Sequence, residues 1–399
     1  MRFPLLFVSA ALCVALSLHA TPVPARGLTP ALSQIKPIDF DRLSGWQFDA
    51  LEEAWPAWLR SCRALSQRGQ PFQDLCAQSA VLTADGSGQG PEREAVRSFF
   101  ETHFQPFLLL DPKAPERETN TITGYYEPLV RGSRSPGGLY QHPLYRVPPD
   151  LISVQLETVY PDLRALRLRG RLQGGQVVPY PSRGEIERKG LLKGQELVWL
   201  DDPIDAFFMQ VQGSGRVQLP DGSSIRLGYA NQNGHPYQSI GKWLVERGEL
   251  SLSQASMQGI KAWLARNPHR QDELLHQNPS LVFFRELPDS GDPSEGPLGS
   301  LGVPLTAGRS IAVDPRFIPL GLPVILNTAF SEGPVQRLVM AQDTGSAILG
   351  AHRADFFFGG GEAAGELAGR MKSPGQLIVL LPRALSPSAL ERLFQGGRR

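Results

Sequence analysis

The segment Val339-Met-Ala-Gln-Asp-Thr-Gly-Ser-Ala-Ile-Leu-Gly-Ala-His-Arg-Ala-Asp-Phe-Phe-Phe-Gly-Gly-Gly361 decides the fold prediction. An apolar lead at Val339 and an aromatic run at Phe356–Phe358 favour two strands, and the glycines between them allow tight turns. Two carboxylates, Asp343 and Asp355, stand where these strands meet the turns. Acidic side chains are rarely buried unless they are paired. Each is therefore a turn cap or a working acid, and for a single Asp the turn cap is favoured.

A second segment, Ala307-Gly-Arg-Ser-Ile-Ala-Val-Asp-Pro-Arg-Phe-Ile-Pro-Leu-Gly321, has the same character and is followed by a strand-like run at Leu322–Leu326. Asp314 ends the short apolar run of this segment, and Pro315 stops the strand behind it. Asp314, Asp343 and Asp355 therefore fall within one compact β-rich region.

These residues resemble the three-aspartate domain of the membrane-bound lytic murein transglycosylase A family. The shared motifs are Ala-Val-Asp-Pro, Ala-Gln-Asp-Thr-Gly, and Arg-Ala-Asp before an aromatic run and glycines, in that order. Upstream matches, Thr-Gly-Tyr-Tyr-Glu-Pro among them, extend the resemblance over roughly residues 124–382. The resemblance implies a double-psi β-barrel interrupted by an inserted smaller β domain, with a glycan-binding groove between the two.

Length and composition agree with a two-domain, mainly β protein that has some α structure. The chain has 399 residues, more than one ordinary domain. Its 40 Lys and Arg nearly cancel its 39 Asp and Glu, which argues against a protein that binds nucleic acid through bulk charge. The 41 Gly and 35 Pro suit many short strands joined by turns.

Composition shifts along the chain divide it into segments. Aromatic and apolar residues recur at spacings of three and four over residues 46–107, which predicts helices, with Pro56 kinking or splitting the first. Turn signals between alternating runs predict a separate β domain after residue 129. The expected segments are a signal peptide at 1–25, N-terminal helices with the first part of the barrel domain at 26–128, an inserted smaller β-barrel domain at 129–287, the three-aspartate part of the double-psi barrel at 288–386, and a C-terminal tail at 387–399.

The N-terminus reads as a secretory signal. Arg2 supplies a positive end, and the apolar core at Leu5–Leu18 is shorter than a typical transmembrane helix. A lipidated cysteine needs a small residue before it, but Leu12 precedes Cys13, so a lipoprotein anchor is not favoured. Members of the resembled family are typically lipoproteins tethered to the outer membrane. We therefore expect a periplasmic protein, with peripheral association with the outer membrane left open.

Cys62 and Cys76 are the cysteines that remain after removal of the signal. In an oxidising compartment they can form a bridge that closes a modest loop. Two buried thiols on neighbouring helices explain the sequence equally well.

Two stretches supply candidate substrate-binding residues. Tyr125 and Tyr126 in the extended segment Thr121–Val130 would by themselves be assigned to a strand core, although tyrosines can also stack on sugar rings. The resemblance implies instead a groove-lining strand, and we include Thr123 and Glu127 of this segment. Residues 206–217 predict a strand on which Gln210 and Gln212 share one face, where amides can bond sugar hydroxyls. A solvated polar face explains the two glutamines equally well without the resemblance.

Other chemistries lack support. The seven histidines show no ligand spacing, so neither a metal nor another cofactor is expected. No Gly-x-Ser-x-Gly elbow is present. Glu286 is a further acid, for which a salt bridge with a nearby Arg is favoured over catalysis.

The resemblance implies a reaction without water: cleavage of the β-1,4 bond between N-acetylmuramic acid and N-acetylglucosamine by attack of the muramyl C6 hydroxyl on its own C1. One carboxyl can then act first as acid and afterwards as base. It must begin protonated, so its pKa has to be raised by apolar surroundings or a neighbouring carboxylate. By its place in the Arg-Ala-Asp motif we assign this role to Asp355, with Asp343 as its supporting carboxylate. Asp314, grouped with the substrate-binding residues, is expected mainly to bond turn amides.

Two alternatives remain at this point. A non-catalytic peptidoglycan-binding or wall-loosening module would bind glycan without cleaving it. A true hydrolase would use two carboxylates and leave reducing-end sugars. The partner in every case is the glycan strand of peptidoglycan; a monomer is expected, and membership of a wall-synthesis or division complex is left open.

Overall fold

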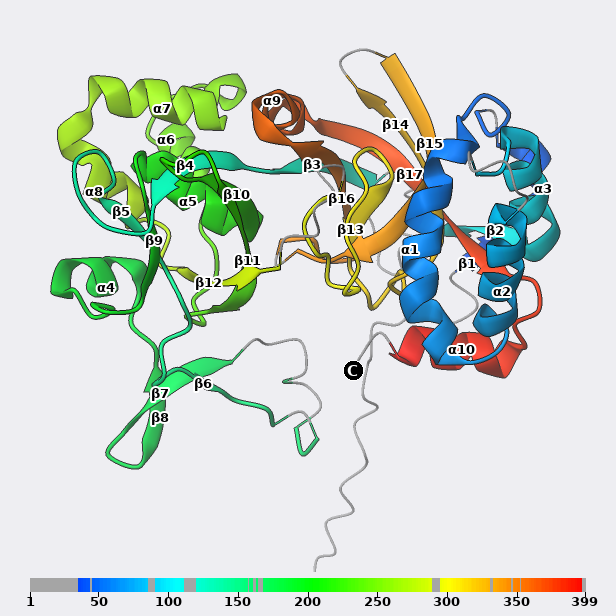
Figure 1. The fold of residues 1–399 in the computed structure, drawn as a ribbon, viewed down its shortest axis with the longest axis horizontal. Coiled ribbons are helices and arrows are strands. Elements are labelled where there is room, and N and C mark those ends of the chain that lie inside the picture. Colours follow the sequence, from blue (N-terminus) through cyan, green and yellow to red (C-terminus); the bar gives the residue numbers. More distant parts are fainter. Residues whose placement is uncertain are drawn as a thin grey trace, which may run out of the picture.

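The computed structural model describes residues 35–43, 45–84, 90–110, 120–156, 158–160, 163, 168–288, 295–330, 333–345, 347–351 and 353–396. The predicted signal peptide and Cys13 lie outside this part of the chain. Figure 1 shows two β-rich bodies side by side, with a cap of helices on the outer side of one of them. The prediction of a mainly β chain with some helices is confirmed.

The larger body is built on an eight-stranded sheet in the order β1-β2-β17-β14-β15-β13-β16-β3, in which β17 also pairs with β3. The additional pairing closes the strands from β17 to β3 into a ring. The strands are β1 (Ile35–Pro37), β2 (Phe104–Leu109), β3 (Asn120–Glu127), β13 (Ser310–Val313), β14 (Pro323–Phe330), β15 (Gly333–Asp343), β16 (Arg353–Gly360) and β17 (Lys372–Pro382).

Gly375 makes closure of the ring possible. It is the register partner of Thr328 on β14 and of Asn120 on β3, so β17 passes from one neighbour to the other at this residue. A Cβ atom there would lie 2.7 Å from Ile122 Cγ1 and 2.8 Å from the Asn327 carbonyl oxygen. Only glycine allows the three strands to approach this closely.

A helical cap covers one side of the ring. It comprises α1 (Trp55–Leu65), α2 (Phe72–Thr83) and α3 (Arg93–His103), with the 3₁₀ turns Phe40–Arg42, Leu51–Ala54 and Ser66–Arg68. Pro56 lies in the first turn of α1, where a missing N–H costs nothing, so it separates the helix from the turn before it. Trp58, Phe100 and Phe104 are fully buried and join the cap and the ring in one core.

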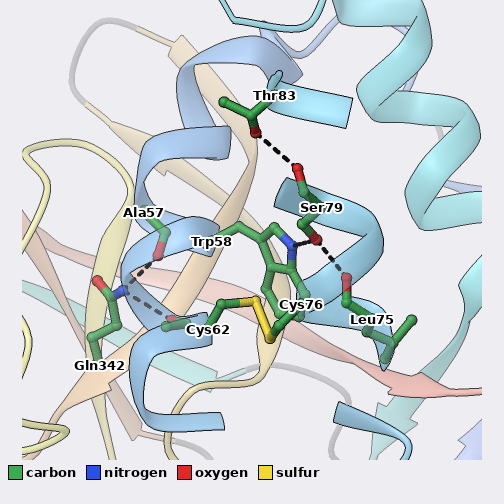
Figure 2. The surroundings of a disulfide bond; sticks show 9 residues. Ala57, Trp58, Cys62, Leu75, Cys76, Ser79, Thr83 and Gln342 are labelled. Carbon is green, nitrogen blue, oxygen red and sulfur yellow. Dashed lines mark hydrogen bonds between the residues drawn. A yellow bond between two sulfur atoms is a disulfide. The ribbon is translucent and has the colours of Figure 1, made fainter. Parts of the chain in front are cut away.

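Cys62 and Cys76 form a disulfide that joins α1 to α2, which decides the question the sequence left open. Figure 2 shows the polar contacts around it. The indole N–H of Trp58 donates to Ser79 Oγ at 2.8 Å. Gln342 of β15 donates to the Ala57 carbonyl oxygen at 2.8 Å, which ties the cap to the strand that ends at Asp343.

Replacing both cysteines with serine is expected to lower the free energy of unfolding by about 3 kcal/mol, because the loop between residues 14 apart is then free in the unfolded chain. Urea unfolding followed by tryptophan fluorescence would measure the loss. Adding reductant should lower the free energy of unfolding of the parent protein but leave that of the serine variant unchanged. Equal stability of the two proteins without reductant would contradict the expectation.

The second body, inserted between β3 and β13, holds a sheet in the order β12-β11-β10-β4-β9-β5. A bridge between Arg146 and Phe284 links its two edges. Its strands are β4 (Leu129–Ser133), β5 (His142–Tyr145), β9 (Glu196–Leu200), β10 (Ser214–Gln218), β11 (Ser224–Gln232) and β12 (Val282–Leu287). Its helices are α4 (Arg183–Lys189), α5 (Pro203–Gln212), α6 (Ile240–Glu246), α7 (Met257–Arg266) and α8 (Gln271–Leu275), with the 3₁₀ turns Leu252–Gln254 and Pro268–Arg270. A projecting arm carries β6 (Ile152–Ser153), β7 (Arg169–Gln173) and β8 (Gln176–Pro179).

The predicted strand over residues 206–217 is wrong, because its first half is the helix α5. Asp202 caps the helix by accepting from the Ile204 and Asp205 amides, Pro203 occupies the first turn, and Gly213 in the left-handed region ends it. These start and stop signals outweigh the strand-like composition. Gln210 and Gln212 therefore do not share one face of a strand but lie in the last turn of a helix.

The remaining helices belong to the ring body. α9 (Gly361–Arg370) follows β16 and packs on β3, and α10 (Pro387–Gly396) ends the described chain. The segment expected from the sequence to be a C-terminal tail begins with this helix. Among the described residues, no helix combines the length and the apolar character needed to cross a bilayer.

Candidate active site

The two aspartates of the Val339–Gly361 segment meet across one strand. In β13, Ala312 is the register partner of Asp343 on β15 and also of Asp355 on β16. The backbones of the two aspartates are therefore separated by one intervening strand, and adjacent strands lie about 4.8 Å apart. Ala312 is buried, and its methyl group leaves the space between the two carboxylates open.

Asp355 is half-buried, and its carboxylate accepts a hydrogen bond from a neutral hydroxyl. Thr123 Oγ1, on the neighbouring strand β3, donates to Asp355 Oδ1 at 2.7 Å. Burial raises the pKa of Asp355 to about 6, and the charge of Asp343 adds to the effect, while the Thr123 hydrogen bond and Arg353 oppose it. About a tenth of Asp355 therefore carries a proton at pH 7, against almost none for an aspartate with an ordinary pKa.

Asp343 is held by donors on two sides. Ser300 donates to Oδ1 through its amide and its hydroxyl, each at 2.9 Å, and the Tyr125 hydroxyl donates to Oδ2 at 3.2 Å. Burial raises the pKa of Asp343, and these donors limit the rise. Burial and the two aspartates also raise the pKa of Tyr125 well above its ordinary value, so its hydroxyl remains a donor.

A cleft of about 260 Å³ opens in front of the two aspartates, between the ring body and the inserted body. The ring-body wall comprises Gly124, Tyr125, Ala312, Asp343, Thr344, Gly345, Ala347, Ile348 and Asp355. The inserted-body wall comprises Arg183, Gln210, Val211, Gln212, Tyr237, Asn278, Ser280 and Val282. A second cavity, of about 340 Å³, is lined by Phe356 and Phe358 on the other face of β16 and has no carboxylate in its wall.

The inserted-body wall fixes the orientation of one amide. Gln210 Oε1 accepts from Arg183 Nη2 at 2.7 Å and from the Val282 amide at 3.2 Å. Arg183 itself is buried and also donates to the Asn278 and Ser280 carbonyl oxygens. Because the carbonyl of Gln210 is occupied by two donors, its NH₂ group is the part left to donate into the cleft.

Asp314 lies beneath the loop that forms one side of the cleft. It is buried and accepts from the Gly350 amide at 2.7 Å and the Arg316 amide at 3.1 Å. Burial alone would raise the pKa of Asp314, but the hydrogen bonds from Arg316 and Gly350 outweigh it and lower the pKa. Asp314 is absent from the residues that line the cleft, and its contacts order the loop that carries Gly345 and Ile348.

Tyr126 and Glu127, which the sequence assigns to substrate binding, are not among the residues that line the cleft. Tyr126 is buried against α9, and its hydroxyl contacts Met257 of the inserted body. Glu127 is buried where the chain passes into the inserted body and pairs with Arg216 at 3.0 Å. The Met257 and Arg216 contacts place both side chains at the junction between the two bodies.

Several polar groups around the aspartates are not predicted by the sequence. Ser300 comes from the turn 299–302, far in sequence from any aspartate it contacts, so spacing gave no signal. Arg183 and Asn278 are polar residues scattered in the inserted body. Arg353 belongs to the Arg-Ala-Asp motif, but the motif alone indicates no role for it. Within the described residues, no group of three or more His, Cys, Asp or Glu side chains is arranged to hold a metal ion.

Comparisons with known proteins give one consistent result. Residues 121–285 match the family model described as "MltA specific insert domain", and residues 309–381 match "3D domain". The curated "Membrane-bound lytic murein transglycosylase A" of Escherichia coli is 37% identical over 268 residues, so the match spans 65% of this chain and 65% of that relative. The structure of MltA from Neisseria gonorrhoeae is 36% identical with a TM-score of 0.75, covering 90% of this chain and 96% of that one. Escherichia coli MltA with bound chitohexaose is 25% identical with a TM-score of 0.62, covering 89% and 92%.

Proposed function

Because this chain belongs to the membrane-bound lytic murein transglycosylase A family, we propose that it cleaves the β-1,4 bond between N-acetylmuramic acid and N-acetylglucosamine in peptidoglycan and leaves a 1,6-anhydromuramyl product. One observation carries the proposal: a carboxyl group with a pKa raised to about 6, Asp355, in a cleft between two bodies. The chitohexaose bound to the Escherichia coli relative supports a glycan as the ligand of this cleft.

Asp355 acts as the acid in the first step. Its proton passes to the glycosidic oxygen as the bond to C1 breaks, and positive charge develops on the sugar ring. Its burial serves this step, because an ordinary aspartate with a pKa near 3.8 would hold almost no proton at neutral pH. Asp343, on the other side of Ala312, is suited to stabilise the developing positive charge.

In the second step Asp355, now a carboxylate, accepts the proton of the muramyl C6 hydroxyl while the oxygen bonds to C1. The nucleophile belongs to the substrate itself, so positioning supplies much of the acceleration. No water is consumed, and Asp355 ends the cycle protonated. A single acid–base residue therefore suffices, in contrast to the pair that hydrolysis requires.

The cleft walls supply candidate glycan contacts. Tyr125 packs on Phe357 with ring centroids 5.2 Å apart and offers an aromatic face to a sugar ring. The NH₂ group of Gln210 is a donor suited to an acetamido carbonyl, and Gln212 lines the same wall. Thr123 acts through Asp355, and Asp314 through the loop that it orders.

The ring of strands is, on this proposal, a double-psi β-barrel, and the inserted sheet a smaller barrel. The glycan strand runs between them. We further propose that the protein is exported by its N-terminal signal and acts in the periplasm, peripherally at the outer membrane, since the names of its membrane-bound relatives support an envelope location. The closed ring and the family match support this arrangement.

Mass spectrometry of the products released from purified sacculi tests the proposed function. Anhydromuropeptides, lighter than the hydrolytic products by one water, are the expected result. Reducing-end muropeptides would show a hydrolase. Binding to sacculi without soluble products would show a non-catalytic glycan-binding module, and either outcome would overturn the proposal.

The reaction rate should fall as the pH rises through about 6. Asp355 must start protonated, and above its pKa the protonated fraction drops about tenfold per pH unit. Initial rates of anhydromuropeptide release measured between pH 4.5 and 8 would locate this limb. A rate that rises steadily from pH 5 to pH 8 would contradict an acid role for Asp355.

A further inference from the structure

Arg353 reaches the acid–base residue indirectly, through a threonine. β16 pairs with β3 so that Arg353 lies opposite Thr121 and Asp355 opposite Thr123. The guanidinium spans both threonines: Nη1 donates to the Thr121 carbonyl oxygen at 3.0 Å, and Nη2 donates to Thr123 Oγ1 at 3.2 Å. Thr123 Oγ1 in turn lies 2.7 Å from Asp355 Oδ1.

The direction of each hydrogen bond follows from the chemistry of the donors. A guanidinium has five N–H groups and no acceptor, so Thr123 Oγ1 can only accept from Arg353. The threonine hydroxyl has one hydrogen, and Asp355 Oδ1 is the partner to which it is donated. Asp355 Oδ1 is therefore occupied as an acceptor.

We propose that Arg353 is a positioning residue that fixes the Thr123 hydroxyl as a donor to Asp355 Oδ1, so that the proton moved in catalysis resides on Asp355 Oδ2. This inference rests on the proposed function for the role of that proton. Asp355 Oδ2 then donates to the glycosidic oxygen and afterwards accepts from the C6 hydroxyl, without rotation of the carboxyl between the two steps.

Other charged and titratable groups face Asp355 and have to be separated from this effect. Asp343 approaches from β15 and Tyr125 from β3, and Arg183 and Tyr237 lie across the cleft. Arg353 also acts on Asp355 directly through its charge. The variants therefore have to separate the effect of the Arg353 charge from the effect of its two hydrogen bonds, to Thr121 and to Thr123.

Arg353→Lys keeps the charge, but an ammonium group does not reproduce the planar fork that spans Thr121 and Thr123. We expect kcat for anhydromuropeptide release to fall about tenfold, KM to change little, and the alkaline limb of the pH profile to stay near 6. Arg353→Gln and Thr123→Val should lower kcat similarly and move the limb to higher pH, because each removes an interaction that lowers the pKa of Asp355. Thr123→Ser, which retains the hydroxyl, should restore kcat.

A double-mutant cycle supplies the test of the indirect route. In a Thr123→Val background, Arg353→Lys should cost no further kcat, because the hydroxyl through which Arg353 acts is gone. Arg370→Gln is the control for loss of one positive charge, since Arg370 pairs with the exposed Glu366 on α9. It should leave kcat and the pH profile unchanged.

Two results would overturn the proposal: full kcat in Arg353→Lys, or the same loss from Arg353→Lys with and without the Thr123 hydroxyl. A ¹³C titration of the Asp355 carboxyl needs no turnover and should show a raised pKa in Thr123→Val and Arg353→Gln. An unchanged pKa of Asp355 in both variants would also contradict the proposal. Failure of the proposed function is distinct, because the parent protein would then release no anhydro product while these shifts persist.

Discussion

Asp355→Asn is expected to lower anhydromuropeptide release from sacculi about 10³- to 10⁴-fold. General acid–base catalysis contributes about 10²- to 10⁴-fold, and here one residue is asked to act in both halves of the cycle. The asparagine side chain keeps an oxygen that can accept from Thr123, so the local geometry should be retained. The initial rate of product release, quantified by mass spectrometry at pH 5.5, measures the loss.

The same substitution should not destabilise the fold. The folded pKa of Asp355 is raised from 3.8 to about 6, so between these values the folded state binds more protons than the unfolded state. The contribution of Asp355 to stability is therefore most favourable at low pH and declines as the pH rises through this window. Above it, wild type holds a buried carboxylate that Asp355→Asn removes. At pH 7 the melting temperature of the variant should equal or exceed that of wild type.

Asp221→Asn is the matched control for the loss of one carboxylate. Asp221 lies in the β10–β11 turn of the inserted body, where it accepts from Ser223, and it does not line the cleft. It should retain wild-type rates. Near-normal product release by Asp355→Asn would remove Asp355 from the catalytic role, and a large drop in its melting temperature would mean that lost activity reflects unfolding.

The ring body could be predicted from the sequence to a large extent, because its signals are local. An apolar lead marks the strands that end beside Asp314 and at Asp343, an aromatic run marks the one that carries Asp355, and a glycine or proline follows each; the structure has β13, β15 and β16 at those places. The motifs also predicted that Asp343 and Asp355 would approach each other. Their common register partner, Ala312, could not be predicted, because register between strands distant in sequence is set by tertiary packing.

The remainder depended on contacts that sequence spacing does not encode. Residues 206–212 have strand-like composition, yet the cap at Asp202 and the stop at Gly213 make them helical. Glu127 reads as a groove carboxylate, but the arginine that pairs with it, Arg216, comes from a strand 89 residues away. Such partners become visible only when the chain is folded.

The largest stability effect is expected at Asp49, which precedes the helical cap. Both of its carboxylate oxygens accept from Arg309 Nη1 at 2.9 Å, and Oδ2 accepts from the Leu338 amide at 2.6 Å. Asp49 is 6% exposed and Arg309 2% exposed. Asp49→Ala leaves a buried guanidinium without its main counter-charge and should lower the free energy of unfolding by about 3–5 kcal/mol, measured by urea unfolding.

The size of that loss depends on burial, and the chain offers a control for it. Glu53 also pairs with Arg309 at 2.9 Å, but its side chain is 63% exposed. Glu53→Ala should therefore cost at most about 1 kcal/mol, because water screens an exposed pair and can replace it. Removing both buried charges in Asp49→Leu/Arg309→Met should cost less than Asp49→Ala alone, since no unpaired ion remains. Equal losses of free energy of unfolding in Glu53→Ala and Asp49→Ala would contradict this expectation. They would mean that the charge of each carboxylate, and not the burial of Asp49, determines how strongly the helical cap is anchored to β13 and β15.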